Sequence, residues 1–363
     1  MTQQPSRARD LGIAPGRHAP GPLNAITDVP GVRVGHVTLH REPGIRTGVT
    51  AIVPDLVDRS GGQLPAGLFT GNGFGKLTGA TQLAETGVLE TPIVLTGTLS
   101  VFRAADALVS YVLDLPGNEQ VQSVNAVAGE TNDGFLSDIR ARPVTQGDVR
   151  GALTGAQGGP VAEGAVGAGT GTGALGFKAG IGTSSRVAEL AGGVPVTVGV
   201  LLQANFSGTL TVLGVPIPAG AALAGLAGAP PARPATRAEA PESAEPRGNS
   251  CMIIVAVDRG LDSRQLGRVA RRAIFGLARA GSDFAGGSGD YALALAATGA
   301  GEPVADRDLD PVFTAVQEAV EEAVLNSVFM ATTTYGHGGH VRHACPHGFV
   351  LRACRAAGVL PAG

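Results

Sequence analysis

The apolar positions of the chain follow two patterns, which together predict a layered α/β fold. Between Ser263 and Gly281 the apolar residues recur at helical spacing and arginines occupy other positions, so Asp262 or Ser263 can cap a helix that Gly281 ends. Short apolar runs such as Cys251–Val257 and Tyr291–Ala296 predict buried strands instead. Because strands are mixed with amphipathic helices, the helices are expected to cover the sheets.

The same reading predicts further elements along the chain. They are strands and tight turns within residues 25–54, a helix over Phe102–Leu115, a pair of strands within Gly193–Val212, and a helix that Asp310 caps before Pro311 and that runs towards Gly336.

Two segments have too little bulky apolar content to pack. Residues 1–23 are polar, with scattered Arg and Pro, and are expected to form a flexible N-terminal arm. Residues 229–247 contain five prolines among alternating Ala, Glu and Arg, which indicates a disordered linker. This linker stops just before Asn249 and Ser250, where the strand at Cys251 begins.

Composition excludes several classes of protein. The net charge is -3 with no basic tract, which argues against nucleic-acid binding, and the partner is expected to be a small molecule. The uncharged stretch Leu190–Ala232 is interrupted by Gly, Pro and amides, so it predicts buried strands and not a membrane span. The 3 cysteines form no paired framework and the first 22 residues lack a secretory apolar core, so a cytoplasmic location is expected.

The Asn249-Ser250 pair allows a specific chemistry. If the chain cuts itself before Ser250, the serine hydroxyl becomes a nucleophile beside its own α-amine, whose unperturbed pKa of roughly 7.7 to 8.0 suits a general base. The alternative is that Asn-Ser is a polar turn that ends the linker. The pair alone does not decide between them.

Motifs spread over most of the chain bear on this choice. As a set and in this order they resemble the self-processing aminopeptidases of the DmpA/BapA type (L-aminopeptidase/D-esterase and β-peptidyl aminopeptidase). The matching segments are Asn24–His36, Gly129–Gly134, Glu163-Gly164, Val166-Gly167, Phe177-Lys178, Gly182-Thr183, Gln203–Phe206, Gly248–Val257, Ala273–Gly281 and Gly286–Tyr291.

The resemblance implies a fold and an assembly. The expected fold is a four-layer αββα sandwich, as in DmpA and ornithine acetyltransferase, built as a single domain from two self-cleaved chains. Residues 24–249 would form the α-chain and residues 250–363 the β-chain, with the nucleophile at its N-terminus. The resemblance also implies a homotetramer that needs no metal or cofactor.

The resemblance also assigns roles to five residues. Ser250 is the nucleophile, and Ser288 and Asp290 orient it and help to move its proton. The Asn205 amide donates to the oxyanion of the tetrahedral intermediate, and Glu130 binds the free ammonium of the substrate. The position of Asp290 is often glutamate in the family, so its carboxylate here is one methylene shorter.

Each of these residues can also be explained by a structural role alone, without a part in catalysis. Ser288 and Asp290 lie in a glycine-rich sequence typical of a turn, which does not match the G-x-S-x-G nucleophile elbow because Asp290 replaces the closing glycine. Glu130 alone reads as a solvated or capping residue. Asn205 alone reads as a hydrogen-bonded core amide.

Three other motifs could indicate cofactor or metal sites. Gly171–Gly176 matches G-x-G-x-x-G, but no apolar strand precedes it. Gly75-Lys76 lacks the first glycine of a P-loop. A C-terminal cluster could gather zinc, although its spacing matches no standard finger; its members are His337, His340, His343, Cys345 and His347.

The sequence therefore predicts a self-cleaving, N-terminal-serine aminopeptidase that acts on short peptides, amides or esters through an acyl-enzyme. One alternative is an acyltransferase of the ornithine acetyltransferase type, against which Ser250 argues, because that enzyme uses threonine. A second alternative, of a different class, is a zinc- or nucleotide-binding module.

Overall fold

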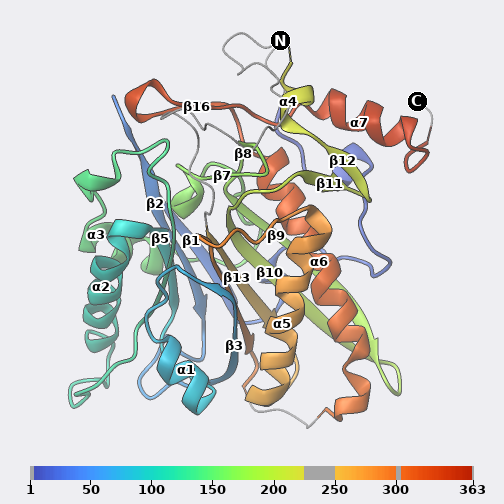
Figure 1. The fold of residues 1–363 in the computed structure, drawn as a ribbon. Coiled ribbons are helices and arrows are strands. Elements are labelled where there is room, and N and C mark those ends of the chain that lie inside the picture. Colours follow the sequence, from blue (N-terminus) through green and yellow to red (C-terminus); the bar gives the residue numbers. More distant parts are fainter. Residues whose placement is uncertain (1–3, 225–249, 300–303, 362–363) are drawn as a thin grey trace.

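The computed structural model describes residues 4–224, 250–299 and 304–361, and within them two larger β-sheets carry the fold (Figure 1). The four-stranded sheet has the order β1 (Val32–Arg41), β2 (Ile45–Pro54), β5 (Ile93–Gly97), β6 (Val127–Thr131). The six-stranded sheet has the order β4 (Val88–Leu89), β3 (Leu64–Gly73), β14 (Gly289–Ala296), β13 (Ser250–Val257), β10 (Val194–Asn205), β9 (Ile181–Leu190).

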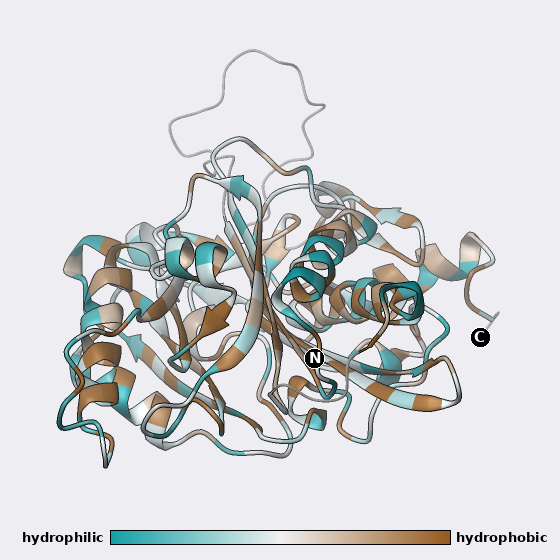
Figure 2. Ribbon diagram, turned by 90° about the horizontal axis from the view of Figure 1, so that it is seen from below, coloured by the Kyte–Doolittle hydropathy of each residue, from teal (hydrophilic) through white to brown (hydrophobic). Residues whose placement is uncertain are grey.

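Helices pack on both sheets. Side chains of α2 (Val101–Leu113) and α3 (Gln146–Thr154) share a core with the four-stranded sheet, and those of α5 (Ser263–Ala280) and α6 (Asp310–Phe329) share one with the six-stranded sheet. The strands between these helices are mostly hydrophobic in Figure 2. The predicted mixed α/β fold is confirmed.

Smaller elements complete the described part of the chain. They are α1 (Ala80–Thr86), α4 (Ala219–Ala222), α7 (His347–Ala356) and three short hairpins: β7 (Gly173–Ala174) with β8 (Phe177–Lys178), β11 (Leu210–Val212) with β12 (Val215–Ile217), and β15 (Thr334–Tyr335) with β16 (Val341–Arg342).

Strand β13 shows how the side chains are divided between two cores. Its residues alternate, so Cys251 and Ile253 pack on the helix side while Met252 and Ile254 pack in a core that also contains Leu95 of the other sheet. Ser250 lies two residues before Met252, so the two side chains point to the same side of the sheet. The Ser250 side chain therefore faces the space between the two sheets.

The predicted helix at residues 263–281 is confirmed together with its signals. The Asp262 carboxylate accepts a hydrogen bond from the Gln265 N–H, and Gly281 has a left-handed φ of 102°. The predicted strands at residues 25–54, 193–212, 251–257 and 291–296 and the helix near Phe102 also form.

The second predicted helix differs at both ends. Leu309 is the N-cap of α6 without a side-chain hydrogen bond, and Asp310 is already helical, so Asp310 does not cap Pro311. The helix ends at Phe329, well before Gly336. Beyond it, threonines favour extended backbone because branching at Cβ restricts χ1, and Thr334 begins β15.

The N-terminal segment is packed in the structure, unlike the predicted flexible arm. Ala8 and Ile13 are 0% exposed. Arg9 Nε donates to both carboxylate oxygens of Glu322 at 3.0 Å, and Arg7 pairs with Glu163 at 2.7 Å. These buried partners anchor residues 4–23 to the body of the protein.

Two sequence predictions lie beyond what the structure describes. The proposed linker at residues 229–247 and Asn249 both fall outside the described residues. Among the helices that are described, none has the length and apolar character needed to cross a membrane.

Candidate active site

Ser250 and Asn205 meet where two neighbouring strands end. They are paired residues of the antiparallel strands β13 and β10, and they are 5% and 2% exposed. Directly paired residues project to the same face of a sheet, with Cβ atoms roughly 4.5 to 5.5 Å apart. Both side chains therefore face the space between the sheets, next to each other.

The loop before β14 brings a second group of predicted residues to Ser250. Strand β14 runs parallel to β13 with Asp290 beside Cys251. The Gly289 N–H donates to Ser250 Oγ at 3.2 Å, and Ser288 Oγ donates to Asp290 Oδ1 at 2.7 Å. A backbone hydrogen bond from Ser288 N–H to Ala285 C=O, 2.8 Å long, closes the turn that delivers them.

Asp290 is a buried carboxyl group. It is 0% exposed, and burial raises its pKa to about 6, while the hydrogen bond from Ser288 acts in the opposite direction. A carboxyl group with a pKa near 6 changes charge close to neutral pH. This property is typical of residues that handle protons.

Two glycines form the wall beside Ser250. A Cβ on Gly289 would overlap the Gly75 Cα and lie 3.2 Å from Ser250 Oγ. A Cβ on Gly75 would lie 2.9 Å from the Gly289 Cα and 3.3 Å from Glu130 Oε1. The Tyr291 hydroxyl donates to the Gly75 C=O at 2.9 Å and fixes this loop. Backbone thus approaches closely where side chains would obstruct the site.

Glu130 lies on the other side of Gly75. It is 1% exposed, and its Oε1 accepts a hydrogen bond from the Lys76 N–H at 2.9 Å. The Thr98 hydroxyl donates to Oε2, and Lys76 Nζ lies 3.6 Å from Oε1. The carboxylate is buried and partnered, unlike the solvated residue that the sequence alone suggests.

The amide of Asn205 is held in a fixed orientation. Its Oδ1 accepts from the Gly173 N–H at 3.1 Å, so Nδ2 is identified as the donor side, and Nδ2 donates to the Asn132 C=O at 2.7 Å. Asn132 directly follows β6, the strand that contains Glu130. The end of β10 is thereby tied to the loop that follows β6.

A further buried carboxyl group lies in that loop. Asp133 is 1% exposed, and burial raises its pKa to about 7. A Cβ on Gly97 would lie 2.5 Å from Asp133 Oδ2, so the glycine makes room for this carboxyl group. Near neutral pH, Asp133 carries less than a full negative charge.

The structure thus brings all five predicted side chains to one end of the two sheets. The sequence motifs do not assign site roles to Lys76, Thr98, Gly75 or the Gly289 N–H. Gly75 and Lys76 are notable in the sequence only as an incomplete P-loop motif. The Gly289 N–H is backbone, so no residue type signals it, although its loop belongs to a matching motif.

The histidines of the candidate metal cluster and the glycines of the candidate nucleotide motif lie at separate places in the fold. His340 stacks on Phe135 with ring centroids 4.4 Å apart, whereas the His347 ring lies against Phe329, with Nε2 3.1 Å from the Phe329 carbonyl oxygen. Across the residues that the structure describes, no three His, Cys, Asp or Glu side chains are grouped to hold a metal. The glycines at 171–176 lead into the β7–β8 hairpin and not into a helix.

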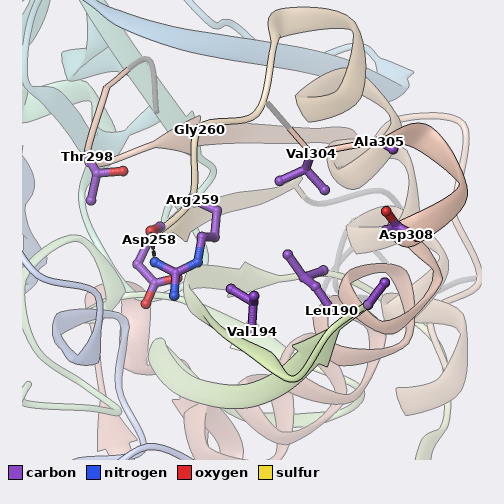
Figure 3. Close-up of a pocket in the computed structure, with 10 residues that line it drawn as sticks. Leu190, Val194, Asp258, Arg259, Gly260, Thr298, Val304, Ala305 and Asp308 are labelled. Carbon is purple, nitrogen blue, oxygen red and sulfur yellow. Dashed lines mark hydrogen bonds between the residues drawn. The ribbon is translucent and has the colours of Figure 1, made fainter. Parts of the chain in front are cut away.

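A pocket of about 550 Å³ lies elsewhere, at the opposite end of β13 (Figure 3). Its lining includes Asp258 and Arg259, which directly follow β13, together with Leu190 and Val194. Ser250 is the first of the eight residues of this strand, so the pocket is roughly 25 Å away. None of the five predicted site residues lines it.

Comparisons with known proteins agree on one family. The model of peptidase family S58 matches residues 24–342. The β-peptidyl aminopeptidase BapA of Sphingosinicella xenopeptidilytica is 38% identical, over 96% of this chain and 91% of its own length.

Solved structures of aminopeptidases are also similar to this chain. A β-aminopeptidase of a Burkholderia species is 38% identical with a TM-score of 0.84, covering 98% of this chain and 100% of its own. The L-aminopeptidase D-Ala-esterase/amidase of Ochrobactrum anthropi, described as a prototype for the serine aminopeptidases and a variant of the Ntn hydrolase fold, is 35% identical with a TM-score of 0.84, covering 98% and 99%.

Proposed function

The chain belongs to peptidase family S58 and is an aminopeptidase, and from this premise we propose that it hydrolyses N-terminal residues of short peptides, amides or esters through an acyl-enzyme on Ser250. One observation carries the proposal. Ser250 Oγ accepts the Gly289 N–H opposite Asn205, and the close-packed backbones of Gly289 and Gly75 lie next to Ser250 and Glu130 respectively.

The proposed enzyme first processes itself. Ser250 Oγ attacks the carbonyl of Asn249, the peptide C–N bond breaks, and the resulting ester is opened by water. The products are chains 1–249 and 250–363, which together form the proposed four-layer αββα domain. The new α-amine of Ser250 then supplies a base beside the hydroxyl.

In the acylation step, the Ser250 α-amine takes the hydroxyl proton as Oγ attacks the substrate carbonyl. Collapse of the tetrahedral intermediate breaks the scissile C–N or C–O bond, and the proton passes to the leaving group. The proposed role of Ser288 and Asp290 is to orient these groups, since their hydrogen bond holds the loop that contacts Ser250.

Deacylation repeats the sequence with water as the nucleophile. Water adds to the ester carbonyl and gives its proton to the α-amine; the acyl C–O bond then breaks and Ser250 regains its proton. In both steps, negative charge develops on the carbonyl oxygen. We assign its stabilisation to the Asn205 amide and the Gly289 N–H, the two donors beside Ser250.

Glu130 is the proposed site for the substrate ammonium. It is a buried carboxylate whose partners hold it in place, and binding a cation there positions the neighbouring carbonyl near Ser250. The name of the BapA relative mentions β-peptides, so we include residues whose amine is one carbon further from the carbonyl.

The test compares aminoacyl p-nitroanilides with and without an N-acetyl group. The wild-type protein is expected to hydrolyse the free amines and to leave the acetylated forms almost untouched, and Glu130→Gln should remove this selectivity. Equal rates on both forms would contradict the proposal.

Neither the acyltransferase nor the binding module is favoured by the family match. The tetramer and the cytoplasmic location stay predictions.

A further inference from the structure

Glu130 shares its subsite with a lysine. Lys76 donates its N–H to Glu130 Oε1 at 2.9 Å, and its Nζ lies 3.6 Å from the same oxygen. The Lys76 side chain is 40% exposed, whereas that of Glu130 is 1% exposed. The anion is therefore fixed in the protein, and the cation lies at the mouth of the subsite, where a ligand can reach it.

This pairing changes which substrates the subsite favours. A single substrate ammonium meets a carboxylate that already has a cation beside it, so Lys76 repels the ammonium and weakens its net attraction to Glu130. Asp133, three residues after Glu130 in the chain, adds less than one negative charge because burial raises its pKa to about 7. The subsite is dipolar, with one charge of each sign.

A ligand head with two opposite charges matches such a dipole. Its ammonium can bind Glu130 while its carboxylate binds Lys76, which replaces one ion pair with two and leaves neither protein charge unpaired. The Lys76 head lies over the exposed Phe74 ring, with Nζ 5.7 Å from the ring centroid, so it stays at the surface, where a ligand carboxylate can reach it.

We propose that Glu130 and Lys76 together recognise an N-terminal residue that carries its ammonium and a carboxylate on the same carbon, as a β-aspartyl residue does. This inference rests on the proposed function, because it requires Glu130 to bind the substrate amine. It names the substrate class that the same site prefers.

The covalent structure of a β-aspartyl residue fits this arrangement. In an ordinary N-terminal residue the α-carbonyl is part of the scissile bond, so no carboxylate remains beside the amine unless a side chain supplies it. In a β-aspartyl residue the peptide bond is at the side-chain carbonyl, and the free α-carboxylate stays next to the ammonium. That carbonyl is the one Ser250 attacks, with the same bond changes as before.

The experiment measures kcat/KM for β-aspartyl and β-alanyl p-nitroanilides, which differ only in the carboxylate. The wild-type protein is expected to prefer the β-aspartyl substrate by at least about fivefold, the effect of one partly exposed charge pair. Lys76→Met should lower the β-aspartyl value roughly tenfold and raise the β-alanyl value, so that the preference inverts. Lys76→Arg should keep the wild-type order.

Two controls separate this inference from simpler effects. Arg307→Met removes an equal charge from a side chain that is 87% exposed, and it should change neither value. Thermal unfolding of each variant checks that the fold is intact.

The possible outcomes separate the inference from the proposed function. If the wild-type protein and Lys76→Met turn over both substrates with the same ratio, the inference is overturned while the aminopeptidase proposal stands. If Glu130→Gln has no effect on either substrate, the amine subsite is wrong and the inference falls with it. An inverted ratio confined to Lys76→Met supports both.

Discussion

Asn205 and Ser250 form a cross-strand pair at the ends of β10 and β13, and both are almost fully buried. Hydrogen bonds from the Gly173 N–H and to the Asn132 C=O fix the Asn205 amide before any substrate binds. A donor fixed in this way needs no reorganisation when charge develops beside it, which is the condition for strong oxyanion stabilisation.

Asn205→Ala should therefore lower kcat by about 10²- to 10³-fold, the loss typical of one oxyanion donor. The measurement is steady-state hydrolysis of an aminoacyl p-nitroanilide by fully processed protein. Asn326→Ala is the matched control, because Asn326 is also a buried amide but contacts Ala8 and Thr183. That variant should lose stability and keep its kcat; an unchanged kcat in Asn205→Ala would exclude the proposed donor.

Gly289→Ala should abolish activity almost completely. The added Cβ would overlap the Gly75 Cα and lie 3.2 Å from Ser250 Oγ, so the loop must shift away from the nucleophile. We expect kcat/KM to fall at least about 100-fold, since small displacements of reacting groups have effects of that size. Gly286→Ala is the control in the same loop, because a Cβ there has no atom within 4 Å. Wild-type rates in both variants would refute this account of the wall.

The pH profile should show two ionisations on its acid side. The Ser250 α-amine must be neutral, with a pKa of roughly 7.7 to 8.0, and Asp290 must be ionised, with a pKa of about 6 raised by burial. As pH falls, log kcat/KM should first decline with slope 1 and then, below about pH 6, with slope 2. In Asp290→Asn, activity should be lower by about 10²-fold or more, with slope 1 throughout. A slope of 2 that persists in this variant would assign the second proton elsewhere.

Removing one partner of the buried ion cluster should strongly destabilise the fold. Glu322 is 0% exposed and pairs with Arg186 at 2.7 Å and with Arg9 at 3.0 Å. Glu322→Gln removes the buried charge that both arginines share and leaves Arg186 with its longer pair to Glu318 at 3.6 Å, so we expect a loss of about 3 to 5 kcal/mol in the free energy of unfolding. Denaturant titration measures it. Arg307→Gln, in an exposed pair with Asp308, should change stability by less than about 0.5 kcal/mol.

Local signals explain which elements could be predicted from the sequence. Helix α5 has its cap, its apolar spacing and its terminal glycine within one short segment, so it could be read directly. The packing of the N-terminal segment could not, because Arg9 and Glu322 are 313 positions apart and only the folded chain brings them together. The polar composition that suggested a free arm in fact supplies buried ion pairs.

In the candidate site, too, some residues could be predicted from the sequence and others could not. Ser250, Ser288, Asp290, Asn205 and Glu130 lie in segments that match a family, and the structure brings them together. The pairing of Lys76 with Glu130 depends on how the loop after β3 folds over β6, which no local pattern records. Conversely, His340 and His347 are close in sequence, but they contact Phe135 and Phe329 respectively.

The central claim is that the chain cleaves itself before Ser250 to create its own catalytic base, and intact-mass measurement of the purified, denatured protein tests it most directly. The account predicts two masses, for residues 1–249 and 250–363, in active wild-type protein. It predicts one mass, for all 363 residues, in an inactive Ser250→Ala variant. Wild-type protein that is fully active while its mass remains that of the uncut chain would contradict the account.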